Sequence, residues 1–146
     1  MATAERVDPL RGYNFKVELN GITAAAFREC TGLTQETDPV EYREGNERHL
    51  NVRKLRGLNK VPNIVLKRGI TPDTQLYEWY RLILNGTDAR RDGAVTLTNE
   101  DQQAVHRWAF KAGWICKWEG PTLNATSNDV AIETIEICVE RVEMVS

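Results

Sequence analysis

Apolar and polar residues alternate along several stretches of the chain, and this alternation is the pattern of strands that are half-buried in a sheet. The first such stretch is "YNFKVEL", residues 13–19, and the pair Asn20-Gly21 follows it directly. An Asn-Gly pair between two apolar runs is typical of a hairpin turn. We therefore expect residues 13–19 to pair with the next run, "AAAFREC", residues 24–30.

Further strands are predicted from the same pattern. The runs "VEYREG", residues 40–45, and "NIVLK", residues 63–67, are expected to be strands. A second hairpin is expected from "GAVTLTNE", residues 93–100, and "AVHRWAFKAGWICKWEG", residues 104–120. The final run, "VAIETIEICVERVEMV", residues 130–145, is rich in β-branched residues and predicts one long strand.

One helix is predicted between residues 72 and 85. Thr71 can cap its first turn, Pro72 suits the first helical position, and the carboxylate of Asp73 favours the positive end of the helix dipole. Apolar residues then recur three and four positions apart, as on one face of a helix. This apolar stripe consists of Leu76, Trp79, Tyr80 and Ile83.

Many strands and a single helix predict a mainly β fold, a rolled β-barrel or sandwich with one α-helix. We expect one domain over residues 1–146, in which residues 1–10 are a flexible N-terminus. The composition is that of a globular protein, with 41% hydrophobic and 27% charged residues. Charged residues occupy the start, "MATAERVDPLRG", where a secretory leader would be apolar, so we expect folding in the cytoplasm.

Charge is distributed unevenly along the chain. Residues 43–68 contain eight Lys and Arg against two Glu, a net charge of +6, whereas residues 119–146 carry a net charge of −5. Within the basic part, "REGNERHLNVRKLRGLNK", residues 43–60, has no clean period and is predicted to be a long basic interaction loop. A basic and an acidic segment in the same chain favour association between copies.

Lys67, Arg68 and Gly69 stand between a predicted strand and the predicted helix, where an anion could bind. However, the corner lacks the Gly-x-x-x-x-Gly-Lys-Ser/Thr pattern of a phosphate loop. Pro72 also stands where a backbone amide would be needed. The sequence therefore supports phosphate binding only weakly.

The residue types needed for nucleophilic catalysis are not arranged for it. The two histidines, His49 and His106, have no identifiable orienting partner, and Cys30, Cys116 and Cys138 are far apart in the sequence. We expect these cysteines to be small buried side chains rather than nucleophiles. The chain is therefore predicted not to be an enzyme and to need no cofactor.

Metal and nucleic-acid binding are weaker alternatives. Acidic residues near the C-terminus are not joined by a histidine, and their spacing places neighbours on opposite strand faces, so we expect no metal site among Glu133, Glu136, Glu140 and Glu143. The basic segment 43–68 could contact nucleic acid, but its only aromatic residue is Tyr42 at its border. The alternative function is therefore a small nucleic-acid-binding β-barrel that uses residues 43–68.

Five blocks of the sequence are distinctive: "YNFKVELNGITAAAFRECTGL", "EYREGN", "KLRGLNKVPNIVLKRGIT", "RRDGAV" and "KWEGPTLNATSNDVAIETIEI". They resemble the tail-tube proteins of contractile phages and of phage-tail-like contractile injection systems. They occur in the family's order between about Asp8 and Glu143, and so cover nearly the whole chain. Two of them, which contain "PNIVLKRG" and "EGPTLNATSNDVAIETIEI", are specific rather than generic.

The resemblance implies a fold related to the type VI secretion tube protein and a structural role. Six copies would form a ring, and rings would stack into a hollow tube for cargo or DNA that a contracting sheath drives through a target envelope. The implied partners are further copies of this chain, the sheath protein, and the baseplate and tube-terminating proteins, without membrane insertion by this chain. It would be made in the bacterial cytoplasm and assembled into a phage tail or an injection particle that can leave the cell.

In this family the long loop contacts neighbouring subunits, including those of the next ring, and residues 43–60 correspond to it here. We therefore expect Lys67 and Arg68 to meet carboxylates of a neighbouring subunit rather than a phosphate. Glu78 and Arg81, which lie off the helical stripe, are expected to face the sheath. The predicted subunit interface consists of Arg43, Glu44, Arg48, Arg53, Lys54, Arg56, Lys60, Lys67, Arg68, Glu133, Glu136 and Glu140.

Overall fold

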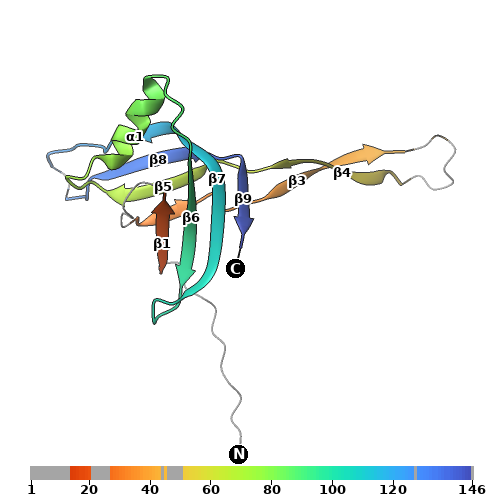
Figure 1. Cartoon of the computed structure of the whole chain (residues 1–146), viewed down its shortest axis with the longest axis horizontal. Coiled ribbons are helices and arrows are strands. Elements are labelled where there is room, and N and C mark those ends of the chain that lie inside the picture. The colour runs from red at the N-terminus through yellow and green to blue at the C-terminus, as the bar shows by residue number, and fades with distance from the viewer. Residues whose placement is uncertain (1–13, 21–26, 44, 46–50, 127, 146) are drawn as a thin grey trace, which may run out of the picture.

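The computed structural model describes residues 14–20, 27–43, 45, 51–126 and 128–145. Within these ranges the chain forms nine strands and one helix, which confirms the predicted mainly β fold (Figure 1). The predicted flexible N-terminus, residues 1–10, lies outside the described residues. The elements are β1 (Phe15–Leu19), β2 (Glu29–Thr31), β3 (Glu36–Tyr42), β4 (Arg53–Lys60), β5 (Ile64–Gly69), α1 (Gln75–Leu84), β6 (Arg91–Thr98), β7 (Ala104–Glu119), β8 (Ile132–Cys138) and β9 (Arg141–Met144).

The long strand β7 joins two halves of the main sheet. Its first half pairs with β6 and β9, and its second half pairs with β8, which gives the strand order β1-β6-β7-β8-β5-β2 with β9 beside β7. The partner changes at Ala112, which has a φ of 53°. The Ala112 amide donates a hydrogen bond of 3.0 Å to Asp92 Oδ1, and this bond lowers the pKa of the Asp92 carboxyl. The curved β7 therefore rolls the sheet over itself (Figure 1).

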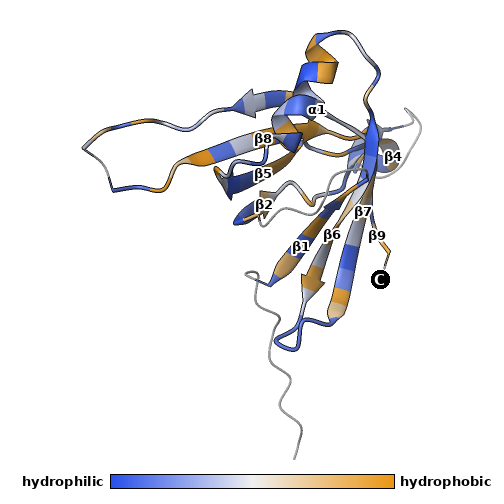
Figure 2. Cartoon of the chain, turned by 60° about the vertical axis from the view of Figure 1, so that its left-hand side comes forward, coloured by the Kyte–Doolittle hydropathy of each residue, from blue (hydrophilic) through white to orange (hydrophobic). Residues whose placement is uncertain are grey.

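The core lies between the two halves of the rolled sheet and under α1. Alternate residues of β5 and β8 point into it, so that Ile64, Leu66, Ile135 and Ile137 are fully buried. Figure 2 shows the same alternation of hydrophobic and hydrophilic residues along β1, β6 and β7. The helix adds Leu76 and Trp79 from its apolar stripe, as predicted, and the Trp79 indole donates to the Ala89 carbonyl over 2.6 Å. In the described part of the chain, no helix has the length and apolar character needed to cross a bilayer.

The described residues on the two sides of Asn20-Gly21 do not pair with each other, in contrast to the predicted hairpin, and residues 21–26 lie outside the described residues. β1 pairs with β6, with Phe15 opposite Leu97, and β2, which overlaps the end of the second predicted run, pairs with β5 instead. The β6–β7 hairpin, which was also predicted, leaves one edge of β6 open to a further strand. β1 pairs with this edge, and apolar and polar residues alternate in both strands. A long-range partner therefore overrides the local turn signal.

Two further element boundaries differ from those predicted. The last run is two strands rather than one, because Glu140 interrupts it, and β9 continues along β7 beyond the end of β8, so that Val142 pairs with Phe110. The helix begins at Gln75 rather than Pro72, and Thr71 does not cap it. Asp73 is held outside the helix, because its carbonyl accepts a hydrogen bond of 3.1 Å from Arg68 Nη2.

Gly93 lies where β6 passes closest to its neighbours. A Cβ atom there would stand 2.4 Å from Phe110 Cζ and 2.6 Å from the Glu18 carbonyl oxygen. Gly93→Ala should therefore lower the free energy of unfolding by about 1–3 kcal/mol through overpacking, measured by urea denaturation. The matched control is Gly69→Ala in β5, where the nearest atom would be Val130 Cγ1 at 3.7 Å. An equal loss in both variants would contradict the steric explanation.

Candidate functional site

The predicted long loop is largely a two-stranded arm. Strands β3 and β4 pair with each other and with no other described strand, and they project from the body along the long axis of the molecule (Figure 1). The prediction of a loop over residues 43–60 is therefore wrong for Arg53–Lys60, and the strand predicted from Val40 begins at Glu36. The alternation was hidden because nearly every residue of β4 is exposed and most are polar. Glu44 and Arg48 of the predicted interface lie outside the described residues.

The arm has two unlike faces. Register places Val40 opposite Leu55 and Tyr42 opposite Arg53, so these four side chains share one face. The other face is mostly charged: Glu41 lies opposite Lys54, and Pro39 lies opposite Arg56. The base of the arm is fixed by an ion pair of 2.8 Å between Lys60 and Asp38, and this hydrogen-bonded pair raises the pKa of Lys60.

Arg68 is buried inside the subunit, with only 2% of its surface exposed. Its Nε forms an ion pair with the Glu133 carboxylate of the neighbouring strand β8, and its Nη1 lies 3.7 Å from the Asp73 carboxylate. Glu133 also accepts a hydrogen bond of 3.3 Å from the Trp118 indole. The prediction that Arg68 meets a carboxylate of a neighbouring subunit is therefore wrong, because its partner is in the same chain.

The same contacts bear on the phosphate alternative. Two groups of the same chain, Glu133 and Asp73, already neutralise the Arg68 guanidinium. Lys67 points to the opposite side of the strand and lies 3.7 Å from Glu29 of β2. The two basic side chains thus do not converge on one anion. The basic corner instead fastens the start of the helix to the sheet.

The other predicted interface residues keep surface positions. Glu136 accepts a hydrogen bond of 2.7 Å from the Asn63 amide, and Glu140 pairs with Arg90 at 3.0 Å. Glu78 and Arg81 both lie on the exposed side of α1. Arg43, Arg53, Lys54, Arg56 and Lys60 are exposed along the arm. The contacts of Asp73 with Arg68 and of Trp118 with Glu133 were not predicted, because they depend on the fold rather than on a sequence pattern.

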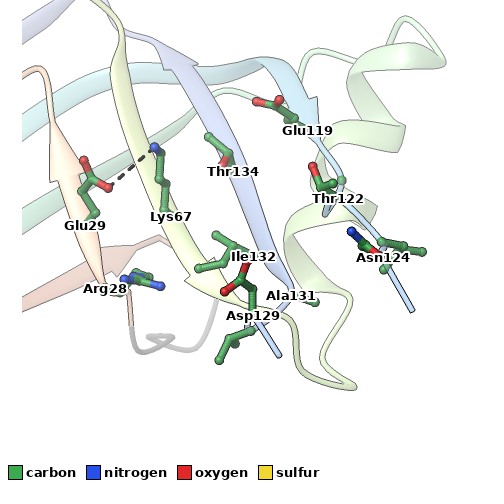
Figure 3. Close-up of a pocket in the computed structure, with 13 residues that line it drawn as sticks. Arg28, Glu29, Lys67, Glu119, Thr122, Asn124, Asp129, Ala131, Ile132 and Thr134 are labelled. Atoms are coloured by element: carbon green, nitrogen blue, oxygen red, sulfur yellow. Dashed lines mark ion pairs between the residues drawn. The ribbon is translucent and has the colours of Figure 1, made fainter. Parts of the chain in front are cut away.

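A groove lies at the end of the body opposite the arm, beside the segment that joins β7 to β8 (Figure 3). Its volume is about 630 Å³, and its walls come from β2, β5, β8 and the joining segment. Two apolar side chains at the groove are unusually exposed, Leu123 at 82% and Val130 at 70%. Charged residues of both signs also line it, namely Arg28, Glu29, Lys67, Glu119 and Asp129.

The described residues that could carry out nucleophilic chemistry are not arranged to do so. Burial raises the pKa of Cys30 to about 11, and burial together with Cys138 raises the pKa of Cys116 to about 12. A thiol with such a pKa is a poor nucleophile at neutral pH. His106 packs beside Trp108, with 6.1 Å between the ring centroids. Among the described His, Cys, Asp and Glu residues, no group of three or more is placed to hold a metal ion.

Comparison with known families completes this description. A model of the T4-like virus tail tube protein gp19 family matches residues 11–143. The chain belongs to this tail tube family. No match was found among curated proteins.

Solved structures agree with the tail tube assignment. A chain of the PVC sheath–tube complex, an extracellular contractile injection system in its extended state, is 31% identical with a TM-score of 0.82, over 93% of this chain and 90% of that one. A chain of the anti-feeding prophage tube-terminating cap is 29% identical with a TM-score of 0.86, over 98% and 95% of the two chains. Hcp1 from Flavobacterium johnsoniae, at 16% identity and a TM-score of 0.57 over 90% and 94%, shares the fold.

The buried pair in this tail tube subunit leads to a stability prediction. Arg68→Met would leave the Glu133 carboxylate buried without its cation, so we expect the free energy of unfolding to fall by about 3–5 kcal/mol. The double variant Arg68→Met/Glu133→Gln should recover much of this loss, since it removes the unpaired charge and keeps an acceptor for Trp118. Urea denaturation followed by circular dichroism measures both. A single variant as stable as wild type would show that the pair is not buried in solution.

Proposed function

We propose that this tail tube protein is the structural subunit of the inner tube of a contractile injection system or contractile phage tail. In this proposal six copies form a ring, and rings stack into a hollow tube through which cargo or DNA passes. The observation that carries it is similarity over nearly the whole chain to a subunit of a solved sheath–tube complex. A scaffold of this kind carries out no covalent chemistry, so the whole chain serves assembly as one domain over residues 1–146.

The edges of the main sheet support ring formation. In the described residues, β1 pairs only with β6 and β9 pairs only with β7, so each leaves one side of its backbone without a strand partner. An edge strand is a template for pairing with another chain. If β1 of one copy pairs with β9 of the next, the contact is head-to-tail, and a head-to-tail contact closes into a ring at a suitable rotation.

The arm and the helix supply further contacts in the proposal. The arm, whose basic residues include Arg53, Lys54 and Arg56, connects neighbouring rings. Glu78 and Arg81 lie on the exposed side of α1 and face the sheath. Sheath and cap are inferred as partners because the similar solved chains come from a sheath–tube complex and a tube-terminating cap. The baseplate is inferred from the sequence resemblance.

The proposed place of action follows from the same relatives. The similar PVC chain is part of an extracellular contractile injection system. We infer that this chain is synthesised in the bacterial cytoplasm, does not insert into the membrane, and leaves the cell as part of an assembled particle.

Electron microscopy tests the proposal. Purified full-length protein examined by negative stain should show six-fold rings or stacked tubes, because a tube subunit assembles with its own copies. Binding to duplex DNA is measured on the same sample, at low and at moderate salt. A monomer that binds DNA with a steep salt dependence would overturn the tube function in favour of the nucleic-acid-binding alternative.

Shortening the arm tests its role in stacking. Replacing residues 41–54 with Asn-Gly would join Val40 to Leu55, which are paired in the arm, through a two-residue hairpin turn. The core contains no residue of the arm, so the variant should keep the far-UV spectrum of a folded β protein. We expect single rings and no tubes by electron microscopy. Tubes of normal length would show that the arm is not the connector between rings.

A further inference from the structure

We propose that Cys116 and Cys138 of one subunit form a disulfide when a low-molecular-weight disulfide oxidises them. The bond joins β7 to β8 covalently and so stabilises the subunit. The inference takes its setting from the proposed function, in which the particle is assembled in the reducing cytoplasm and then leaves the cell, where disulfides persist. The reaction itself depends only on the contacts of the two thiols.

The pairing of β7 with β8 brings the two cysteines to the same part of the sheet. Cys138, the last residue of β8, is opposite Trp114 of β7, and Glu136 is opposite Lys117. The register shifts between these two pairs, because β7 has one residue more than β8 in this stretch. Cys116 lies in this irregularity, and it is therefore closer to the level of Cys138 than a residue of a regular ladder would be.

The two sulfur atoms also lie on the same face of the sheet. The Asn63 amide donates hydrogen bonds to Glu136 Oε1 over 2.7 Å and to Cys116 Sγ over 3.7 Å, so Cys116 is on the Glu136 face. Cys138 shares that face, because it is two residues from Glu136 and successive side chains of a strand point to opposite sides. Ile137, which stands between them, points into the core and is fully buried.

The contact between the two thiols is direct. Burial raises the pKa of the Cys116 thiol, and a hydrogen bond with Cys138 raises it further, to about 12. Such a bond forms only between neighbouring sulfur atoms. The Cys116 thiol also donates to the Glu136 carbonyl over 3.4 Å. Both cysteines are free and only half-buried, so a small oxidant can reach them.

The end of β8 allows the small adjustment that a disulfide requires. The two Cβ atoms of a disulfide stand about 3.5–4.5 Å apart. Cys138 can shift toward Cys116, because β8 ends at Cys138 and the next strand begins only at Arg141. Cys30 is not a competing partner, since it lies in β2, which β5 separates from β8.

The reaction is a thiol–disulfide exchange in two steps. Cys116 keeps its proton at neutral pH, so the Cys138 thiolate attacks first, breaks the S–S bond of the reagent and releases one small thiol. Cys116 then attacks the Cys138 sulfur, which forms the protein disulfide and releases the second small thiol. The two protons that the cysteines lose end on the two released thiols. Two protein thiols are thus oxidised, and one reagent disulfide is reduced.

The first step makes the second step easier. A hydrogen bond with Cys138 and the negative charge of its thiolate both help to raise the pKa of Cys116. The mixed disulfide at Cys138 removes both effects, so the pKa of Cys116 falls toward its ordinary value while burial still holds it up. We therefore expect slow oxidation, which follows assembly rather than competing with folding.

Oxidation of the purified full-length protein tests the inference. Reduced protein is incubated with excess oxidised glutathione and quenched with acid, and the remaining thiols are alkylated with N-ethylmaleimide after denaturation. Of the three cysteines, mass spectrometry should find only Cys30 alkylated after oxidation and all three alkylated before it. Trypsin should release peptides 112–117 and 118–141 joined by a disulfide. The oxidised protein should also have a Tm about 5–10 °C higher than the reduced protein.

Two serine variants are the matched controls. Cys30→Ser should form the same disulfide as wild type and show the same rise in Tm. Cys138→Ser should keep both of its thiols alkylatable and show no rise. Three alkylated cysteines in oxidised wild type, a lasting glutathione adduct at Cys138, a disulfide through Cys30, or an unchanged Tm would each overturn the inference.

Electron microscopy of the same samples separates this inference from the tube function. Tubes in which all three cysteines stay alkylatable would overturn the disulfide and leave the tube function standing. A disulfide between Cys116 and Cys138 in protein that forms neither rings nor tubes would support the modification site and contradict the tube function.

Discussion

The buried ion pair between Arg68 and Glu133 connects the strands β5 and β8 near the start of the helix. It joins β5 to β8, and through Asp73 and Trp118 it reaches the start of the helix and the end of β7. A buried charge without a partner lowers the free energy of unfolding. The registers of β5 against β8 that would separate Arg68 from Glu133 are therefore disfavoured, and the observed register is favoured. The helix that follows places Leu76 and Trp79 in the core.

Two kinds of surface remain after the core has formed. The edges β1 and β9 expose backbone groups, whereas the arm and the groove expose apolar side chains beside charges. Backbone pairing is insensitive to side-chain identity, whereas contacts between apolar and charged side chains depend on it. A subunit that uses both kinds of surface can associate through backbone pairing and discriminate between partners through side-chain contacts.

The elements with a strong local period were predictable from the sequence. The helical stripe from Leu76 to Ile83 and the β6–β7 hairpin were recognised for this reason. The arm was missed because a ribbon exposed on both faces has no core to impose alternation on it. Arg68 was assigned to a neighbouring subunit because sequence spacing does not reveal that β8, more than sixty residues later, brings Glu133 beside it. Family resemblance supplied the fold and role, but not these contacts.

The sharing of β7 by both halves of the sheet has a mechanical consequence. Its first half pairs with β6 and β9, and its second half pairs with β8. β8 and β9 are also consecutive in the chain and both lie along β7, so a force applied at the β9 edge passes to β8 through covalent backbone rather than across a sliding contact between two separate sheets. Shear between the halves would have to break several backbone hydrogen bonds at once. The two halves of the subunit are thus held together as one continuous sheet.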